Sequence, residues 1–136
     1  MLENLSRYQP QALAVLRIMT ALLLMEHGTQ KLLGFPASTM EGGGGELSGL
    51  MLVAGILEAF GGFLILIGFL TRPVAFILCG FMAVAYFMAH APQNFFPVNN
   101  MGDAAILYCF IFLYLFFAGP GVWSVDSSRR AVATTG

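Results

Sequence analysis

The sequence predicts an all-α protein, a four-helix transmembrane bundle whose N- and C-termini are both cytoplasmic. Of its 136 residues, 58% are apolar and only 10% are charged, whereas soluble domains are about half apolar and a quarter charged. Apolar runs of roughly membrane length recur along the chain, and the positive charges outside them follow a pattern that sets an orientation. We therefore expect a single membrane domain over residues 1–136, in contact with the lipid bilayer.

Four apolar runs predict the helices, at about residues 12–33, 47–70, 73–91 and 103–118. A helix needs about 20 residues to cross a hydrocarbon core of about 30 Å. The fourth run is short, so it must use flanking residues or a locally thinner membrane. A secretory signal is a weaker interpretation of the first run, which is too long and carries four ionisable side chains.

The boundaries between these runs contain helix-breaking or helix-starting residues. The glycines from Gly42 to Gly45 disfavour a helix, because glycine loses the most backbone freedom when it is ordered. Thr71, Arg72 and Pro73 make a very short link, and Pro73 suits a first helical turn. The second and third helices should therefore form a tight antiparallel hairpin. The segment 119–121, Gly-Pro-Gly, ends the fourth helix.

Arginines outside the helices indicate the orientation. They lie in the N-terminal segment, the second connection and the C-terminal segment, as Arg7, Arg72, Arg129 and Arg130. The first connection carries Glu41 and Glu46 instead, and the third has no charge. Because positive charges in short connections favour the cytoplasmic side, both termini are predicted to be cytoplasmic.

The two cysteines, Cys79 and Cys109, form no CxxC motif. At about 1.5 Å rise per residue, each lies about 9 Å from one end of its predicted helix, but from opposite membrane faces. Across a core of about 30 Å this leaves a vertical gap of about 12 Å, and a disulfide tolerates a Cα separation of only about 7 Å. We therefore expect both cysteines to be buried packing residues rather than a redox pair.

Glu58 stands in an otherwise uncharged apolar run, residues 47–70. An ionisable side chain at that depth is costly and indicates a functional site. Glu58 shares a helix face with Gly55 and Gly62 through three- and four-residue spacings, and small residues let helices approach closely in lipid. Glu58 should therefore point into the bundle beside its tightest helix contact. A single buried hydrogen bond that only fixes packing is the structural alternative.

The first predicted helix has a polar stripe. At about 100° per residue, one arc of about 80° contains Arg17, Thr20, Leu24, His27 and Lys31. Glu26 projects to the opposite side. Counted from the cytoplasmic ends, Arg17 lies at about 8 Å, Glu58 at about 18 Å and His27 at about 23 Å. Since a guanidinium matches a carboxylate in a bidentate geometry, we expect an ion pair between Arg17 and Glu58.

Further ionisable residues lie toward the outer rim. Lys31 ends the first helix and Asp103 begins the fourth, so a salt bridge between them is one interpretation; helix capping by Asp103 and snorkelling by Lys31 are others. His27 and His90 are the side chains that change charge near neutral pH. No closely spaced HxxxH or ExxH pair is present, so we expect no metal site.

These residues, taken together, resemble a known family. Its pattern is matched by Arg17, His27-Gly28, Lys31-Leu32, Glu58, Gly61-Gly62, Gly68, Thr71-Arg72, Gly102-Asp103, Gly119-Pro120-Gly121 and Asp126. In this order and spacing the chain resembles the DoxX family over nearly its whole length. Glu26 departs from the pattern at a usually apolar place, and Asp103 stands where a glutamate is commoner.

The resemblance implies a multi-pass protein of the bacterial or archaeal inner (cytoplasmic) membrane, similar to subunits linked with terminal quinol oxidase and thiosulfate:quinone oxidoreductase activity. The first functional hypothesis is accordingly a quinone-linked oxidoreductase, or the membrane subunit of one. The candidates for proton transfer are Glu58, His27 and His90. The candidates for binding quinone or substrate are Arg17, Lys31 and Asp103. Without haem or nucleotide motifs, electrons must come from a bound quinone, a redox partner protein or a small reductant.

Two other functions stay open. The protein could be a non-catalytic membrane anchor or assembly partner, in which the polar cluster only specifies packing. It could also be a small transporter or proton-conducting protein with a polar relay, for which four short helices would need to form a homo-oligomer. A net charge of −1 without a basic stripe excludes nucleic-acid binding.

Overall fold

The protein is all-helical in a computed structural model that describes residues 2–39 and 48–135. Every regular element in those residues is a helix, as the sequence predicted. The run from Gly42 to Gly45 and the first residue of the predicted second helix, Leu47, lie outside the described residues. The chain divides into two compact units, Met1–Leu70 with Pro120–Gly136, and Thr71–Gly119. The single domain over residues 1–136 stays a prediction.

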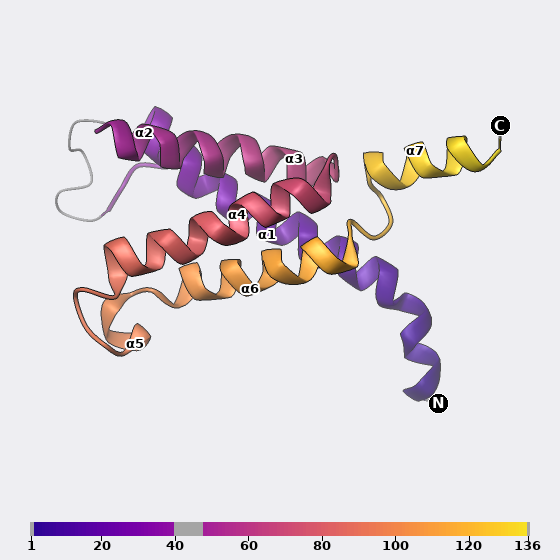
Figure 1. Ribbon diagram of the computed structural model, residues 1–136, viewed down its shortest axis with the longest axis horizontal. Helices are drawn as coiled ribbons and strands as arrows, with labels where there is room; N and C mark the ends of the chain where they lie inside the picture. Colours follow the sequence, from indigo (N-terminus) through magenta and orange to yellow (C-terminus); the bar gives the residue numbers. More distant parts are fainter. Residues whose placement is uncertain (1, 40–47, 136) are drawn as a thin grey trace. The chain divides into compact units, whose positions relative to one another are not determined.

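The first unit consists of a long helix beside a second helix that contains one wider turn. The long helix begins with a 3₁₀ segment, and the C-terminal helix belongs to the same unit (Figure 1). The elements are η1 (Leu2–Tyr8), α1 (Gln9–Leu33), α2 (Gly49–Ile56), the π-helical η2 (Leu57–Gly61), α3 (Gly62–Ile67) and α7 (Val125–Thr134). Together α2, η2 and α3 form one continuous helix.

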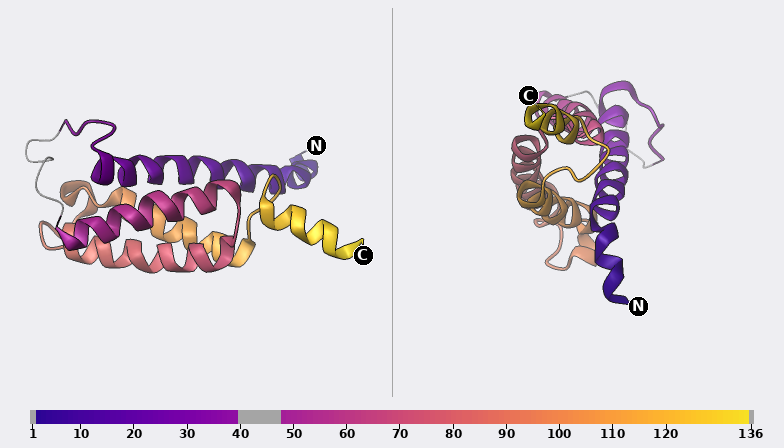
Figure 2. Two further views of the ribbon diagram at one scale, coloured as in Figure 1. Left: turned by 90° about the horizontal axis from the view of Figure 1, so that it is seen from above. Right: turned by 90° about the vertical axis from the view of Figure 1, so that its right-hand side faces the viewer.

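The second unit is a pair of helices that run antiparallel, side by side, in both views (Figures 1 and 2). A short helical turn lies in the connection between them. The elements are α4 (Thr71–Ala85), the π-helical η3 (Tyr86–His90), α5 (Pro97–Asn100) and α6 (Asp103–Ala118).

Within residues 2–39 and 48–135, three helices are long and apolar enough to cross a membrane: Leu2–Leu33, Gly49–Ile67 and Thr71–His90. The helix Asp103–Ala118 is apolar but shorter, with 16 residues. These lengths and compositions fit the predicted transmembrane helices. The fourth span and the cytoplasmic location of both termini stay predictions.

The turn after α3 lies earlier than the sequence predicted. The helix stops at Ile67 because Gly68 adopts a left-handed conformation with φ of 67°, which favours glycine. Leu70 also has a positive φ, 50°. As a result α4 already begins at Thr71, and Pro73 lies inside its first turn, where its missing N–H is tolerated.

The helix α7 was not predicted. Ser124 caps it, because its hydroxyl oxygen accepts a hydrogen bond from the backbone N–H of Ser127, and Asp126 places a negative charge in the first turn. These capping residues were a sequence signal for α7, but the helix is polar and so forms no apolar run. Figures 1 and 2 show α7 leading away beyond the end of α3.

Glycines bring α1 and the helix α2–η2–α3 into close contact. A Cβ on Gly28 would overlap the backbone nitrogen of Ala59 and lie 2.8 Å from its Cα. A Cβ on Gly55 would lie 2.8 Å from Leu32, and one on Gly62 would lie 2.7 Å from Met25. The predicted small-residue face around Glu58 is therefore confirmed, and Gly28 adds the matching small residue on α1.

This contact predicts the effect of a single methyl group. Gly28→Ala should lower the thermal unfolding midpoint in detergent, since forcing an extra carbon into a packed contact costs about 1 to 3 kcal/mol. Gly80→Ala is the matched control, because it is also helical but a Cβ there meets nothing within 4 Å. It should be neutral or stabilise by up to about 1 kcal/mol. Equal loss in both variants would contradict the close contact at Gly28.

Candidate functional site

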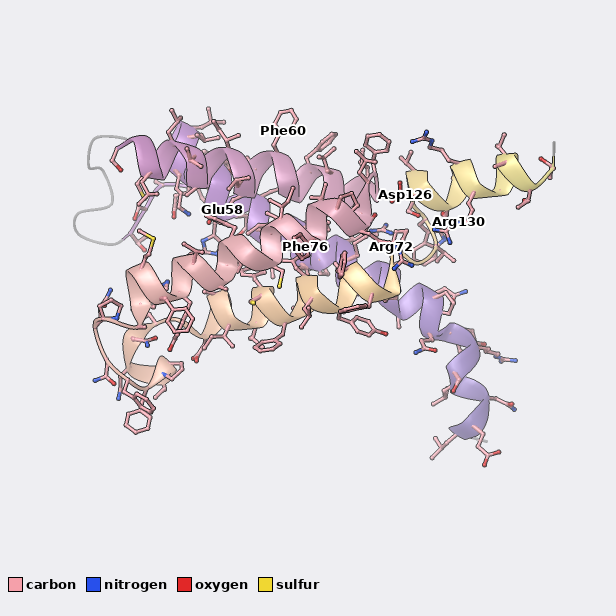
Figure 3. All side chains as sticks on the ribbon, in the orientation of Figure 1. Glu58, Phe60, Arg72, Phe76, Asp126 and Arg130 are labelled. Carbon is pink, nitrogen blue, oxygen red and sulfur yellow. The ribbon has the colours of Figure 1, made fainter. Side chains whose placement is uncertain are left out.

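An ion pair holds Glu58 in the first unit. The Lys31 Nζ atom lies 2.5 Å from the Glu58 Oε2 atom. Lys31 comes from the last turn of α1, and Glu58 from the π-helical turn η2, where it is only 7% exposed. Figure 3 shows Glu58 and the exposed Phe60 on opposite sides of this helix. A π-helical turn is frequent at functional sites, and the cation offsets the cost of placing a carboxylate there.

Lys31 has further hydrogen-bonding capacity. Its Nζ atom also donates to the backbone carbonyl of His27 over 3.5 Å, at the long limit for such a bond. An ammonium has three donors, so at least one can still meet an incoming acceptor. The His27 residue is exposed, one helical turn before Lys31. On the predicted polar stripe of α1, His27 therefore lies one turn from the Lys31–Glu58 ion pair.

The predicted ion pair between Arg17 and Glu58 is wrong. Glu58 pairs with Lys31, which lies 14 residues beyond Arg17 on α1, or about 21 Å along the helix axis. Arg17 is fully buried, and its guanidinium instead donates to backbone carbonyls. The acceptors are the carbonyl oxygens of Pro120, Val122 at 3.3 Å and Trp123 at 2.7 Å.

We call Arg17 and these three carbonyls the arginine clamp. The carbonyls accept from Arg17 because the chain between α6 and α7 is not helical there, with φ of 72° at Gly121 and 55° at Trp123. A guanidinium carries five donors in a fixed fork and suits several acceptors at once. Arg17 was predicted to bind quinone or substrate, but its guanidinium holds the segment between α6 and α7 against α1.

The same clamp encloses the turn after α3. A Cβ on Gly68 would overlap the Ser124 side chain and lie 3.1 Å from the Arg17 Nη1 atom. The backbone N–H of Asp126 donates to the Gly68 carbonyl at 2.9 Å, and the N–H of Leu70 donates to the Asp126 carboxylate at 3.0 Å. The sequence predicted only a helix stop at 119–121, because acceptors on a non-helical backbone leave no residue-type signal.

His90 and Asp103, the other predicted site residues, belong to the second unit. The His90 Nδ1 atom lies 3.0 Å from the Asn100 carbonyl oxygen. Asp103 is the first residue of α6, whose N-cap is Gly102 and has no side-chain capping bond. Asp103 is therefore not the N-cap that sequence analysis considered. Its charge lies in the first turn, where the helix dipole favours an anion.

Asn100 is the residue that sequence reasoning missed in this unit. Its side chain is fully buried and donates to the Tyr86 hydroxyl at 3.2 Å and the Asn94 carbonyl at 2.9 Å. It also accepts from the backbone N–H of Gly102 at 2.8 Å. An asparagine in a loop is too common to stand out, and only its burial identifies this role.

The two cysteines, expected to lie apart, meet in the second unit. The Sγ atoms of Cys79 and Cys109 are 3.7 Å apart. Measured from the same end of the pair, Cys79 lies eight residues after the start of α4 and Cys109 nine residues before the end of α6, about 12 and 13.5 Å. The prediction failed because it measured Cys109 from the opposite end and gave the 16-residue α6 a full membrane span.

Arg72 fixes that register. Its Nη1 atom donates to the carbonyl oxygens of Phe116 at 2.9 Å and Phe117 at 2.6 Å, in the last turn of α6 (Figure 3). These carbonyls have no partner further along their own helix, and a cation is favourable at a helix C-terminus. The start of α4 is thereby tied to the end of α6.

A metal site is not apparent in the part of the chain that the structure describes, where no group of three or more His, Cys, Asp or Glu side chains could hold an ion. The expectation from sequence on this point stays a prediction. The candidate site in the first unit consists of the Lys31–Glu58 ion pair with His27 close by on α1.

The arginine clamp predicts a stability effect. Arg17→Ala should lower the thermal unfolding midpoint sharply, because hydrogen bonds to a charged group contribute about 1.5 to 3 kcal/mol each. Arg17→Lys should recover little, since an ammonium lacks the fork geometry. Scanning fluorimetry in mild detergent measures both. Recovery of stability in Arg17→Ala with Glu58→Ala, relative to Arg17→Ala, would contradict the clamp.

The Lys31–Glu58 pair predicts coupling. In a double-mutant cycle, Lys31→Met and Glu58→Gln together should cost less than the sum of the single changes, by about 0.5 to 3 kcal/mol. The physical reason is that either single change leaves a charge in apolar surroundings without its partner. A cycle between Arg17→Ala and Glu58→Gln is the control and should be additive. Additivity in the first cycle would sink the pairing.

Comparisons with known proteins identify a family and two relatives. The DoxX family model matches residues 12–91, which contain Lys31 and Glu58. A Haemophilus influenzae protein, described as uncharacterized, is 43% identical over 129 residues, covering 93% of this chain and 96% of its own length. The inner membrane protein YqjF of Escherichia coli is 38% identical over 117 residues, covering 82% of this chain and 87% of its own. No solved structure matches. The chain belongs to the DoxX family of membrane proteins.

Proposed function

We propose that this DoxX protein is a multi-pass protein of the cell inner membrane that acts as a quinone-linked oxidoreductase or as the membrane subunit of one. The electron donor is a thiol, thiosulfate or a quinol-linked partner. The observation that carries the proposal is the Lys31–Glu58 ion pair, an acid–base unit set inside an apolar helix pair. Family membership and the inner-membrane relative support the location.

The ion pair suits quinone chemistry. Reduction of a quinone to a quinol consumes two electrons and two protons, and negative charge develops on the carbonyl oxygens. An ammonium fixed by a carboxylate can donate a hydrogen bond to such an oxygen and stabilise that charge. Lys31 can then deliver a proton as a general acid. Glu58 holds the ammonium in place at 2.5 Å.

Histidines supply the proton exchange in this proposal. The exposed His27 lies one turn from Lys31, so its imidazole can pass protons between water and the pair. In this proposal His90 of the second unit transfers protons and Asp103 of the same unit binds quinone or substrate, as the sequence suggested. The quinone is a substrate here, and a redox partner protein or a second copy of the chain completes the electron path.

The membrane topology in this proposal has four spans with both termini cytoplasmic. Support comes from the three helices of spanning length and the shorter apolar α6. Arg7, Arg129 and Arg130 lie at the ends of the chain and Arg72 at the start of α4, which favours the cytoplasm for each of these places.

A non-catalytic anchor or assembly partner is the second candidate. The observation in its favour is the close packing of α1 against α2–η2–α3 at Gly28, Gly55 and Gly62, together with a buried Arg17 that donates to backbone carbonyls. In that case the Lys31–Glu58 pair would specify helix packing rather than chemistry.

Quinone reduction by the purified protein in liposomes tests the proposal. Absorbance of a short-chain quinone should fall with thiosulfate or a thiol donor. Glu58→Gln and Lys31→Met should slow this turnover by about 100-fold or more, as for loss of a general acid. Glu26→Gln is the matched control, because Glu26 is an exposed carboxylate on α1, and should keep wild-type turnover.

Two results would reverse this conclusion. Failure of the wild type to reduce any quinone with any of these donors would contradict quinone-linked chemistry. A cellular phenotype that survives Glu58→Gln and Lys31→Met but is lost in Gly62→Leu would favour the anchor, since that change blocks the contact with Met25 without removing a charge.

A further inference from the structure

The paired thiols of the second unit are the chemically reactive feature that the proposed function leaves unused. The Sγ atoms of Cys79 and Cys109 are 3.7 Å apart, and the chain contains no other cysteine. The sulfurs of a disulfide are about 2.05 Å apart. Closing the bond would therefore move the two sulfurs together by about 1.7 Å, a displacement that side-chain rotation and slight helix movement can provide.

The geometry is held from both ends of the helix pair. Arg72 ties the start of α4 to the last turn of α6. One turn further along α4, the Phe76 ring packs on Phe116 with centroids 5.3 Å apart. At the opposite end, Asn100 joins Tyr86 of η3 to the connection that leads into α6. These contacts fix the register of α4 against α6, and that register places the two thiols next to each other.

An apolar groove gives access to one of the thiols. Cys79 lines it together with aromatic side chains of both helices, Phe76, Phe81, Phe116 and Phe117. Its volume of about 480 Å³ lies within the range of small-molecule pockets. Both cysteines are partly exposed rather than sealed in a core. A lipid-soluble reagent can therefore reach Cys79 through this apolar groove.

We propose that Cys79 and Cys109 form a redox-active dithiol, which a lipid-soluble quinone oxidises to a disulfide and a thiol donor reduces again. This inference rests on the proposed function and names its internal electron carrier. In the oxidation, both S–H bonds break and one S–S bond forms. Two electrons and two protons pass to the quinone, which becomes a quinol with two new O–H bonds.

The return step is thiol–disulfide exchange. A donor thiolate attacks one sulfur of the Cys79–Cys109 disulfide and forms a mixed disulfide, and a second donor thiol releases it as the donor's own disulfide. Both cysteines regain their protons. The dithiol carries two electrons at a time, as a quinone does, in a chain whose sequence has no haem-attachment or dinucleotide motif.

Counting free thiols tests the oxidation step on the full chain in liposomes. After treatment with a short-chain quinone, the protein is acid-quenched, denatured and alkylated with a maleimide polymer that adds a visible mass to each thiol. Because the chain has only two cysteines, the reduced protein takes two tags and the oxidised protein none. We expect quinone to convert two tags to none, and dithiothreitol to restore both.

The matched control moves one thiol to the adjacent position. Cys109→Ser with Phe110→Cys keeps two cysteines but turns one by about 100° around α6, to a site that is 63% exposed. This variant should retain two tags with quinone. Loss of tags in the control to the same extent as in the wild type, or disulfide-linked dimers in place of an intrachain bond, would overturn the pairing.

A second oxidant and a turnover assay separate the two proposals. If the protein keeps two tags after treatment with quinone and also after treatment with diamide, the dithiol proposal is wrong. If diamide forms the disulfide but quinone does not, quinone is not the oxidant and the proposal is also wrong. In the quinone assay, Cys79→Ser and Cys109→Ala should each lower turnover at least tenfold without lowering the unfolding midpoint.

The assays also tell the two failures apart. Unchanged turnover in both cysteine variants would overturn the dithiol while the proposed oxidoreductase function stands. Stoichiometric closure by quinone in a protein without continuous turnover would instead support the dithiol and contradict the proposed function.

Discussion

A carboxylate can remain in the middle of an apolar helix because a cation meets it there, and Lys31 supplies that cation to Glu58 at 2.5 Å. The pairing depends on how closely α1 approaches η2. Gly28 allows the approach, since any side chain there would collide with Ala59. Packing and charge therefore depend on each other in this unit. The close helix contact brings the two charges together, and the ion pair offsets the free-energy cost of burying the carboxylate at that contact.

Two arginines act in the same manner at other places. Arg17 binds the carbonyls between α6 and α7, and Arg72 binds those at the end of α6. In both cases the backbone exposes acceptors that no helical N–H can reach, and a guanidinium supplies several donors from one residue. Arg17 and Arg72 thus complete the hydrogen bonding of the backbone, whereas Lys31 and Glu58 pair two side chains with each other.

The sequence predicted the apolar helices, the polar stripe and the glycine face of Glu58, because these depend on local periodicity. It did not predict the partner of Arg17, since backbone carbonyls of a distant non-helical segment have no residue signature. It also missed the contact between Cys79 and Cys109, which depends on the register of α4 against a short α6. Register is a property of two helices together. Arg72 sets the register here, whereas in the sequence it served only to indicate the membrane orientation.

The hydrogen bonds around Asn100 satisfy polar backbone groups of the second unit from within that unit. A connection between two apolar helices must satisfy its backbone groups internally wherever water is absent. Asn100 does so for the Asn94 carbonyl and the Gly102 N–H, and its amide also donates to the Tyr86 hydroxyl. Arg72 does the same for carbonyls of α6 at the other end. The helices α4 and α6 therefore form a pair in which polar backbone groups at both ends are satisfied from within the unit.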